Sequence, residues 1–247
     1  MREKNKKFGL IGKKIGYSFS KSFFQKKFKK ENILNCSYEN FDIKSIKEVN
    51  AILDSKNIHG LNVTIPYKES IIEYLDDLDP ISEKIGAVNT ICFDNKRKKV
   101  GYNTDCYGFD IMLKPFIRKN LNNALVLGTG GASKAVKYVL DKHNIKTTFV
   151  SRNPVGNQIS YHEINKKILI KNKLIINCTP VGTYPNINES PDINYSFLSK
   201  NNILIDLIYN PVRTKFMESG FNKGCLVSNG EKMLTNQAEK SWILWNK

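Results

Sequence analysis

A glycine-rich turn between an apolar run and a helix-forming segment is the stretch with the clearest chemical use. The run 124–127 is typical of a buried parallel strand, and residues 132–140 are typical of a helix. Gly128 permits a tight turn between them, and Gly130 lets the backbone approach a pyrophosphate. The helix N-terminus then offers unpaired N–H groups and a positive dipole to that phosphate. Strand, glycine turn and helix in this order predict a Rossmann-type dinucleotide site.

The spacing of these glycines departs from the usual Gly-x-Gly-x-x-Gly pattern. Ser133 stands at the third position, and Gly131 is an additional glycine. A strand-to-helix turn that binds no ligand is therefore the alternative interpretation of this segment. If a dinucleotide binds, we expect its loop to comprise Gly128, Thr129, Gly130, Gly131 and Ala132.

The elements that position this loop alternate between strand and helix patterns along the whole chain. In the first half we expect strands at 7–11, 38–41 and 61–65, a hairpin at 88–93 and 99–102, and helices capped by Ser20, at 43–53, at 69–75 and from Pro80. A long helix at 105–118 should lead into strands at 124–127, 146–151, 174–177, 203–207 and 225–227, with helices at 132–142 and 231–245. This alternation predicts an α/β protein with mostly parallel sheets.

Two α/β domains are expected, with the chemistry in a cleft between them. Residues 1–104 should form a substrate-binding catalytic domain, and residues 105–230 a Rossmann-type dinucleotide-binding domain. The C-terminal helix, within 231–247, is expected to pack back on the first domain.

Composition narrows the class of protein. The 247 residues include 39 Lys and Arg against 23 Asp and Glu, which gives a net charge of +16. Such a charge is compatible with nucleic-acid binding, but the basic residues are spread along the chain, so we expect no nucleic-acid partner. No apolar run approaches the roughly 18 residues of a membrane span, and no signal peptide is recognisable. Five scattered cysteines form no metal-type pair, so we expect reduced thiols, no metal site and a cytoplasmic location.

Four polar clusters occur in the first half, near the expected strand ends. They are Gly-Tyr-Ser-Phe-Ser at 16–20, Asn-Val-Thr-Ile-Pro-Tyr-Lys at 62–68, Gly-Ala-Val-Asn-Thr at 86–90 and Gly-Tyr-Asn-Thr-Asp at 101–105. A further cluster, Asn-Gly-Glu-Lys-Met-Leu-Thr-Asn-Gln-Ala, occupies 229–238.

Together with the glycine loop, these clusters resemble the motifs of the shikimate dehydrogenase family, in the same order over almost the whole chain. The family patterns are Gly-His-Ser-x-Ser-Pro, Asn-Val-Thr-x-Pro-(Phe/Tyr)-Lys, Gly-Ala-x-Asn-Thr, (Gly/Tyr)-x-Asn-Thr-Asp, Gly-Ala-Gly-Gly-Ala-(Ser/Gly) and (Asp/Asn)-Gly-x-x-Met-Leu-x-x-Gln-(Ala/Gly). Here Tyr17 replaces the usual His, Lys21 a Pro and Thr129 an Ala. None of these changes removes a polar group that the family uses on its substrate.

The resemblance implies that Lys68 and Asp105 are catalytic and also contact the substrate, acting together on the hydroxyl that is oxidised. Reduction of a ketone needs a hydride donor and a proton donor near the forming alkoxide. A lysine with a lowered pKa can act as the acid or base. A lysine bonded to a carboxylate instead stays charged and stabilises the alkoxide electrostatically. The sequence leaves both roles open.

Other site residues are also implied by the resemblance. Ser18 and Ser20, joined by Tyr209, would bind the substrate carboxylate, in keeping with two hydroxyls at a helix start. Substrate hydroxyls would be bound by Thr64, Asn89 and Gln237. Polar groups of this kind reject analogues that lack a hydroxyl, because a buried partner is then left unsatisfied.

Cofactor choice depends on the residues that end the second Rossmann strand. An acid there binds the ribose hydroxyl of NAD, whereas an Arg accommodates the 2′-phosphate of NADP. Here Ser151, Arg152 and Asn153 follow the strand, with no acid among them, so NADP is expected, held by Ser151 and Arg152. At the nicotinamide end the resemblance implies Thr179, Leu207 and Gly230.

The expected function is NADP-dependent interconversion of 3-dehydroshikimate and shikimate, in the route to chorismate and the aromatic amino acids, by a monomer or homodimer. A quinate/shikimate dehydrogenase with broader substrate and cofactor use is the close alternative. A family member that binds ligand without catalysis and a nucleic-acid-binding protein are more distant ones.

Overall fold

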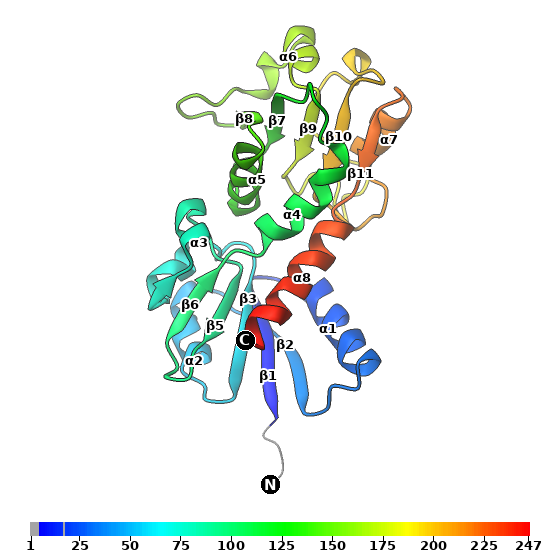
Figure 1. The fold of residues 1–247 in the computed structure, drawn as a ribbon. Helices are drawn as coiled ribbons and strands as arrows, with labels where there is room; N and C mark the ends of the chain where they lie inside the picture. The colour runs from blue at the N-terminus through cyan, green and yellow to red at the C-terminus, as the bar shows by residue number, and fades with distance from the viewer. Residues whose placement is uncertain (1–4, 17) are drawn as a thin grey trace. The chain divides into compact units, whose positions relative to one another are not determined.

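The computed structural model describes residues 5–16 and 18–247, and the chain forms two compact units (Figure 1). The first unit comprises Met1–Tyr107 together with Thr235–Lys247, and the second comprises Gly108–Leu234. Each unit contains one β-sheet with helices packed against it. The α/β class expected from the sequence is confirmed.

The first unit contains a mixed six-stranded sheet in the order β2-β1-β3-β5-β6-β4. Strands β1 to β3 pair in parallel, whereas β5 is antiparallel to both β3 and β6. The strands are β1 Lys6–Gly12, β2 Cys36–Asp42, β3 Ile58–Val63, β4 Asp77–Leu78, β5 Thr90–Phe93 and β6 Lys99–Tyr102. The helices of this part of the chain are α1 Phe19–Lys30, α2 Val49–Leu53, α3 Pro80–Ile85 and α4 Asp105–Leu113, the last of which ends in the second unit.

An aromatic cluster packs helix α8 (Glu231–Trp245) against the sheet of the first unit. The ring of Trp245 stacks on Phe8, with centroids 4.9 Å apart, and lies 5.3 Å from that of Phe24. A side chain on Gly60, in β3, would overlap the Trp245 indole, so β3 needs a glycine where the ring packs on it. Buried aromatic area of this kind stabilises the position of the residues that α8 carries.

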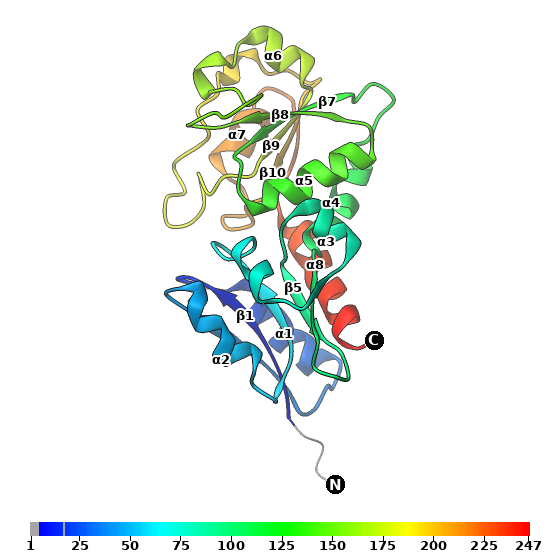
Figure 2. The same ribbon diagram turned by 90° about the vertical axis from the view of Figure 1, so that its left-hand side faces the viewer.

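The second unit contains a parallel five-stranded sheet in the order β11-β10-β9-β7-β8. Its strands are β7 Asn123–Leu127, β8 Lys146–Val150, β9 Leu174–Asn177, β10 Ile203–Asp206 and β11 Leu226–Ser228. Helix α5 (Gly131–Lys142) packs against β8, and α7 (Lys215–Phe221) packs against β10 and β11 (Figures 1 and 2). Helix α6 is Lys166–Lys171. The apolar runs of β9 and β10 are fully buried, as expected for central parallel strands.

Several local predictions were wrong, each for an identifiable reason. Ser18, not Ser20, is the N-cap of α1, and its hydroxyl accepts from the backbone N–H of Lys21 at 3.4 Å. The helix expected at 105–118 ends at Leu113 and continues as a 3-10 turn, Lys114–Phe116, because Pro115 supplies no N–H.

The segments expected as helices at 43–53 and 69–75 are also shorter and partly 3-10. The first consists of a 3-10 turn, Ile46–Glu48, followed by α2, and Ser45 with Glu48 forms a capping box that delays its start. The second is a 3-10 helix over Ser70–Tyr74.

Candidate functional site

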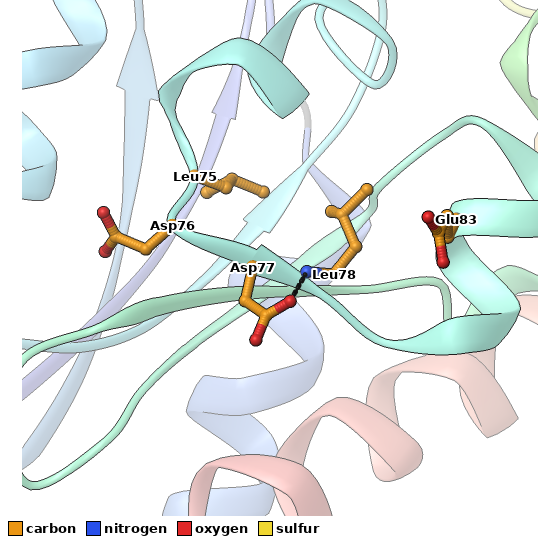
Figure 3. Close-up of a pocket in the computed structure, with 5 residues that line it drawn as sticks. All are labelled: Leu75, Asp76, Asp77, Leu78 and Glu83. Carbon is orange, nitrogen blue, oxygen red and sulfur yellow. Dashed lines mark hydrogen bonds between the residues drawn. The ribbon is translucent and has the colours of Figure 1, made fainter.

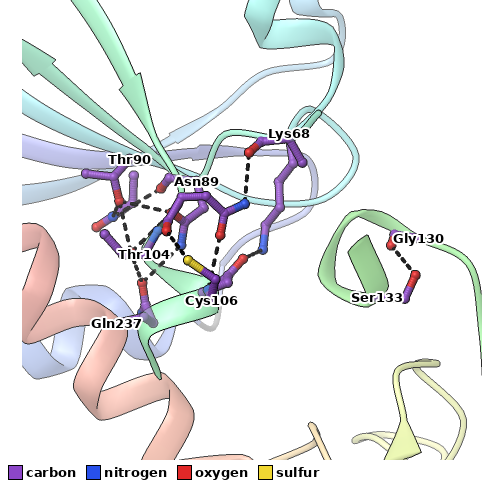
Figure 4. Close-up of polar contacts among 12 residues, drawn as sticks. Lys68, Asn89, Thr90, Thr104, Cys106, Gly130, Ser133 and Gln237 are labelled. Atoms are coloured by element: carbon purple, nitrogen blue, oxygen red, sulfur yellow. Dashed lines mark hydrogen bonds and ion pairs between the residues drawn. The ribbon is translucent and has the colours of Figure 1, made fainter. Parts of the chain in front are cut away.

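Lys68 and Asp105 form a short ion pair within the first unit. Lys68 Nζ lies 2.6 Å from Asp105 Oδ2, and the two side chains are only 13% and 9% exposed (Figure 4). The lysine follows the end of β3, and its carbonyl accepts from the N–H of Val88 at 2.7 Å, which fixes the backbone beside it. The aspartate is the first residue of α4. A charge pair this sheltered from water can act strongly on a neighbouring polar ligand.

Asn89 and Gln237 lie together in the same unit, although 148 positions separate them in the sequence. The Asn89 amide donates to Gln237 Oε1 at 3.4 Å, and the two residues are 3% and 6% exposed. Thr104 joins them, because its hydroxyl contacts Asn89 Oδ1 at 3.1 Å and Gln237 Oε1 at 3.3 Å (Figure 4). The structure thus brings together two of the predicted hydroxyl-binding residues, one directly before β5 and one on α8.

The predicted carboxylate-binding serines lie at the start of α1. Ser18 is the N-cap, and Ser20 is 8% exposed and hydrogen-bonded to the Tyr38 side chain. Thr64 follows β3 and is half-buried, and its N–H donates to Ile11 O at 2.9 Å. Tyr17, the departure from the family motif, lies outside the described residues.

The glycine loop of the second unit joins β7 to the N-terminus of α5. Gly128 has φ +97°, and an added Cβ would lie 2.9 Å from the Thr179 methyl group, so glycine is required there. Gly130 is the N-cap residue of α5, and a Cβ on it would meet nothing within 4 Å. Ser133, in place of the third glycine, donates its hydroxyl to Gly130 O at 2.7 Å. Thr129 is exposed, and Gly131 and Ala132 are half-buried at the first turn of α5.

Loop residues after β9 are held by a buried polar network. Thr179 donates from its N–H and from its hydroxyl to Asn177 Oδ1, at 3.0 and 2.6 Å. Asn177 in turn donates to Asp206 Oδ1 at 3.1 Å, and Asp206 also accepts from the Thr214 hydroxyl at 2.6 Å and the Ile208 N–H at 3.0 Å. Burial raises the pKa of the Asp206 carboxyl to about 6, because desolvation outweighs these three donors.

Leu207 and Gly230 are in backbone contact within the second unit. A Cβ on Gly230 would overlap the Leu207 carbonyl, and the Gly230 N–H donates to Ile208 O at 2.9 Å. The start of α8 and the end of β10 are therefore held side by side. Tyr209, two residues beyond Leu207, is half-buried.

No acid follows β8 in the second unit. Arg152 is exposed, and the Ser151 hydroxyl closes a tight turn by donating to Asn153 O at 3.1 Å and accepting from the Asn153 N–H. Arg152 is therefore an exposed cation within a hydrogen-bonded turn. Such a cation suits a phosphate more than a neutral ribose hydroxyl.

A separate pocket of the first unit contains none of the predicted residues. It is lined by Leu75, Asp76, Asp77, Leu78 and Glu83 (Figure 3). Asp77 pairs with Lys98 at 2.7 Å, and Asp76 lies 3.5 Å from Lys99. The Lys98 ammonium lowers the pKa of Asp77. These acids are already paired with lysines of the neighbouring hairpin, so the pocket is no candidate site.

Sequence reasoning missed Thr104 and Ser241, which contact the predicted site residues. Thr104 stands directly before Asp105 in a quoted motif, and Ser241 follows Gln237 by four residues on α8, which places both on one helix face. That i, i+4 spacing was the available signal. Asn177 and Asp206, which hold Thr179, were missed because neighbouring strand ends meet only in the folded sheet.

Among the residues that the structure describes, no group of three or more His, Cys, Asp or Glu side chains could hold a metal ion. No helix within residues 5–16 and 18–247 has the length and apolar character needed to cross a membrane. All five cysteines are free thiols.

The fold and the site define an α/β protein in which a Rossmann-type parallel sheet with a glycine loop accompanies a mixed-sheet unit bearing a buried Lys–Asp pair. A model of the shikimate dehydrogenase substrate binding domain matches residues 10–91. A Clostridium beijerinckii protein named shikimate dehydrogenase (NADP(+)) is 40% identical over 257 residues, covering 97% of this chain and 92% of that protein. The chain therefore belongs to the shikimate dehydrogenase family.

Two solved structures resemble the chain over nearly its full length. Shikimate dehydrogenase 1 from Peptoclostridium difficile is 38% identical, with a TM-score of 0.81 and coverage of 98% of this chain and 91% of that one. A shikimate 5-dehydrogenase from Thermus thermophilus, solved in complex with NADP(H) and shikimate, is 27% identical, with a TM-score of 0.85 and coverage of 97% and 93%.

Proposed function

We propose that this chain is an NADP-dependent oxidoreductase that reversibly reduces 3-dehydroshikimate to shikimate, a step in the biosynthesis of chorismate and the aromatic amino acids. The relatives' names and the ligands of the Thermus thermophilus structure support this activity. The observation on this chain that carries the proposal is the sheltered 2.6 Å pair of Lys68 and Asp105. It supplies a cation and a carboxylate where a ketone oxygen can be activated.

In the proposed mechanism, Lys68 and Asp105 act on the substrate oxygen that changes between ketone and hydroxyl. When bound, NADPH supplies the hydride that adds to the carbonyl carbon. The negative charge that develops on the oxygen is stabilised by the Lys68 ammonium, and the oxygen then takes a proton. Asp105 holds the ammonium in place through their ion pair. Whether Lys68 itself gives the proton or acts only through its charge is decided by the pH dependence of turnover.

We assign six further polar residues to substrate binding, five from the first unit and Tyr209 from the second. Ser18 and Ser20 at the N-terminus of α1, together with Tyr209, bind the carboxylate, since a helix start favours an anion. Thr64, Asn89 and Gln237 bind ring hydroxyls. The mutual hydrogen bonding of Asn89 and Gln237 in a buried site supports this assignment.

The second unit is assigned to NADP. The open space above Gly130 and the N-terminus of α5 fit a pyrophosphate, to which the loop residues Gly128, Thr129, Gly130, Gly131 and Ala132 contribute. Ser151 and Arg152 receive the adenosine 2′-phosphate, because Arg pairs with phosphate and no acid competes for the site. Thr179, Leu207 and Gly230 line the nicotinamide end.

The experiment that tests the proposed function follows NADPH absorbance in the presence of 3-dehydroshikimate, then repeats the assay with NADH. We expect rapid oxidation of NADPH and much slower oxidation of NADH. Quinate with NAD is the control for the broader quinate/shikimate specificity. No consumption of NADPH would contradict the proposed activity, and equal use of NADH would contradict the role of Arg152.

A cytoplasmic location, a monomeric or dimeric state and the absence of a nucleic-acid partner stay predictions. A gel shift measured at rising salt concentration checks the last of these.

A further inference from the structure

Three buried hydroxyl groups form a closed triangle beneath Asn89 and Gln237. The Oγ atoms of Thr90, Thr104 and Ser241 lie 2.8–3.1 Å from one another. The residues that carry them are at most 2% exposed. Asn62, 3% exposed, donates from Nδ2 to Ser241 Oγ at 2.9 Å and to Thr90 Oγ1 at 3.1 Å. Burying a neutral polar group without a hydrogen bond costs free energy, so each of these groups needs a partner. This requirement limits how their protons can be arranged.

Two backbone groups determine which way the carboxamides of Asn89 and Asn62 are turned. The Thr104 N–H lies 2.6 Å from Asn89 Oδ1, and because an N–H can only donate, the Asn89 atom that faces it is the oxygen. The Asn89 carbonyl lies 3.2 Å from Asn62 Nδ2, and because a carbonyl can only accept, that atom is the amide nitrogen. Both carboxamides therefore have a fixed orientation that needs no assumption about hydrogen positions.

Tyr38 and Asn62 extend this network on one side, and Asn89 extends it on the other. Tyr38 donates its hydroxyl proton to Asn62 Oδ1 at 2.8 Å, and burial raises the pKa of Tyr38, which keeps that proton in place. Asn62 Nδ2 has three acceptors within 3.2 Å, which are Asn89 O, Thr90 Oγ1 and Ser241 Oγ, and shares its two protons among them. Thr90 Oγ1 donates to Asn89 Oδ1 at 3.2 Å (Figure 4).

Ser241 Oγ also lies 3.0 Å from the backbone carbonyl of Gln237, one turn earlier on α8, and can donate to it. The Asn89 oxygen receives the Thr104 N–H on one lone pair, and the second lies within reach of the hydroxyls of Thr90 and Thr104, at 3.2 and 3.1 Å, so the oxygen is satisfied from within the protein. What Asn89 has left to offer a ligand is its NH2 group, whose contact with Gln237 Oε1 is long, at 3.4 Å.

We propose that Asn62, Thr90 and Ser241 are positioning residues that hold the Asn89 carboxamide with its NH2 group toward the ligand, so that the site binds a substrate hydroxyl as a hydrogen-bond acceptor. The inference rests on the proposed function, which places a polyhydroxy acid here. The inference adds that the site selects a hydrogen-bond acceptor on the ligand, and it names the residues that orient Asn89 for this. Groups with lone pairs are accepted at this position, and groups that can only donate, such as an ammonium, are rejected.

The first test removes one hydroxyl without changing shape. Thr90→Val is expected to raise KM for shikimate about five- to tenfold, the typical effect of one buried hydrogen bond, with kcat and KM for NADP near wild type. Thr90→Ser is the matched control, because it keeps the hydroxyl and should restore most of the affinity. Ser241→Ala is a second variant with the same expected change, should Thr90→Val fold poorly.

The second test reverses the polarity of the site. Wild type should be inhibited by shikimate analogues in which a single hydroxyl is replaced by fluorine, and for one ring position the amino analogue should fail to compete. Asn89→Asp presents an oxygen in place of the NH2 group, so it should bind that amino analogue better than the fluoro analogue.

The outcomes separate this inference from the proposed function. If wild type does not oxidise shikimate with NADP, the proposed function fails. If wild type is active but Thr90→Val binds shikimate normally, or Thr90→Ser is impaired as much as Thr90→Val, the positioning role is overturned. If Asn89→Asp leaves the order of analogues unchanged, the assigned polarity is overturned.

Discussion

Replacing Lys68 with alanine is expected to lower turnover by about 10²–10⁴-fold, the usual contribution of a group that acts on the proton or charge of the transition state. At about 1.4 kcal/mol per tenfold change, this is a barrier increase of roughly 3–5 kcal/mol. The structure supports so large an effect, because Lys68 Nζ is 2.6 Å from Asp105 and its side chain is only 13% exposed. NADP binding should stay near wild type, since the glycine loop belongs to the other unit.

Stability has to be separated from catalysis in this experiment. Lys68→Ala leaves the Asp105 carboxylate, 9% exposed, without its cation, and breaking a buried pair costs about 3–5 kcal/mol. The double variant Lys68→Met with Asp105→Asn removes both charges at similar volume, so it should unfold near the wild-type temperature and still be as inactive as the single variant. Steady-state oxidation of NADPH measures turnover, titration with NADP measures cofactor affinity, and thermal unfolding measures stability. Retention of more than about a tenth of wild-type turnover by folded Lys68→Ala would refute the role of Lys68.

Three further variants test other parts of the account. Arg152→Ala should raise KM for NADP about ten- to a hundredfold more than KM for NAD, and equal weakening would leave Arg152 as a structural residue only. Ser18→Ala with Ser20→Ala should abolish most of the preference for shikimate over its methyl ester, at a stability cost of about 1 kcal/mol for the lost cap; undiminished preference would place the carboxylate elsewhere. The raised pKa of Asp206 destabilises the folded state as pH rises from 3.8 to about 6, because the folded protein holds that proton more tightly than the unfolded chain. The free energy of unfolding of Asp206→Asn, relative to that of wild type, should therefore rise by up to about 3 kcal/mol between these pH values. Denaturant titrations at several pH values measure this difference, and a difference that does not change with pH would contradict the raised pKa.

Elements with a strong local signal could be predicted from the sequence. The buried run of β7, the glycine turn and the amphipathic α5 were found within a residue of their bounds, because apolar periodicity and glycine chemistry act locally. The strands β9 and β10 were predictable for the same reason. The short helices α6 and α7 were not, since six or seven residues carry too little periodicity. The two-residue strand β4 exists only through its pairing with β6.

The motifs name candidate site residues, but they do not give the contacts among them. Lys68 and Asp105 are 37 residues apart, and nothing local shows that their side chains meet at 2.6 Å. The orientation of the Asn89 amide depends on a backbone N–H fifteen residues away and on hydroxyls from β5 and α8. Sheet topology brings these groups together, and a linear sequence records topology only indirectly.

Transfer of deuterium is the most direct test of the central claim, which is hydride transfer between NADPH and the ketone. NADPH carrying deuterium on the transferring carbon is incubated with 3-dehydroshikimate and the protein, and the product is identified by mass spectrometry and NMR. We expect shikimate with one deuterium on the carbon that carried the ketone, and none from folded Lys68→Ala over the same time. Shikimate without deuterium, or no shikimate at all, would contradict the account.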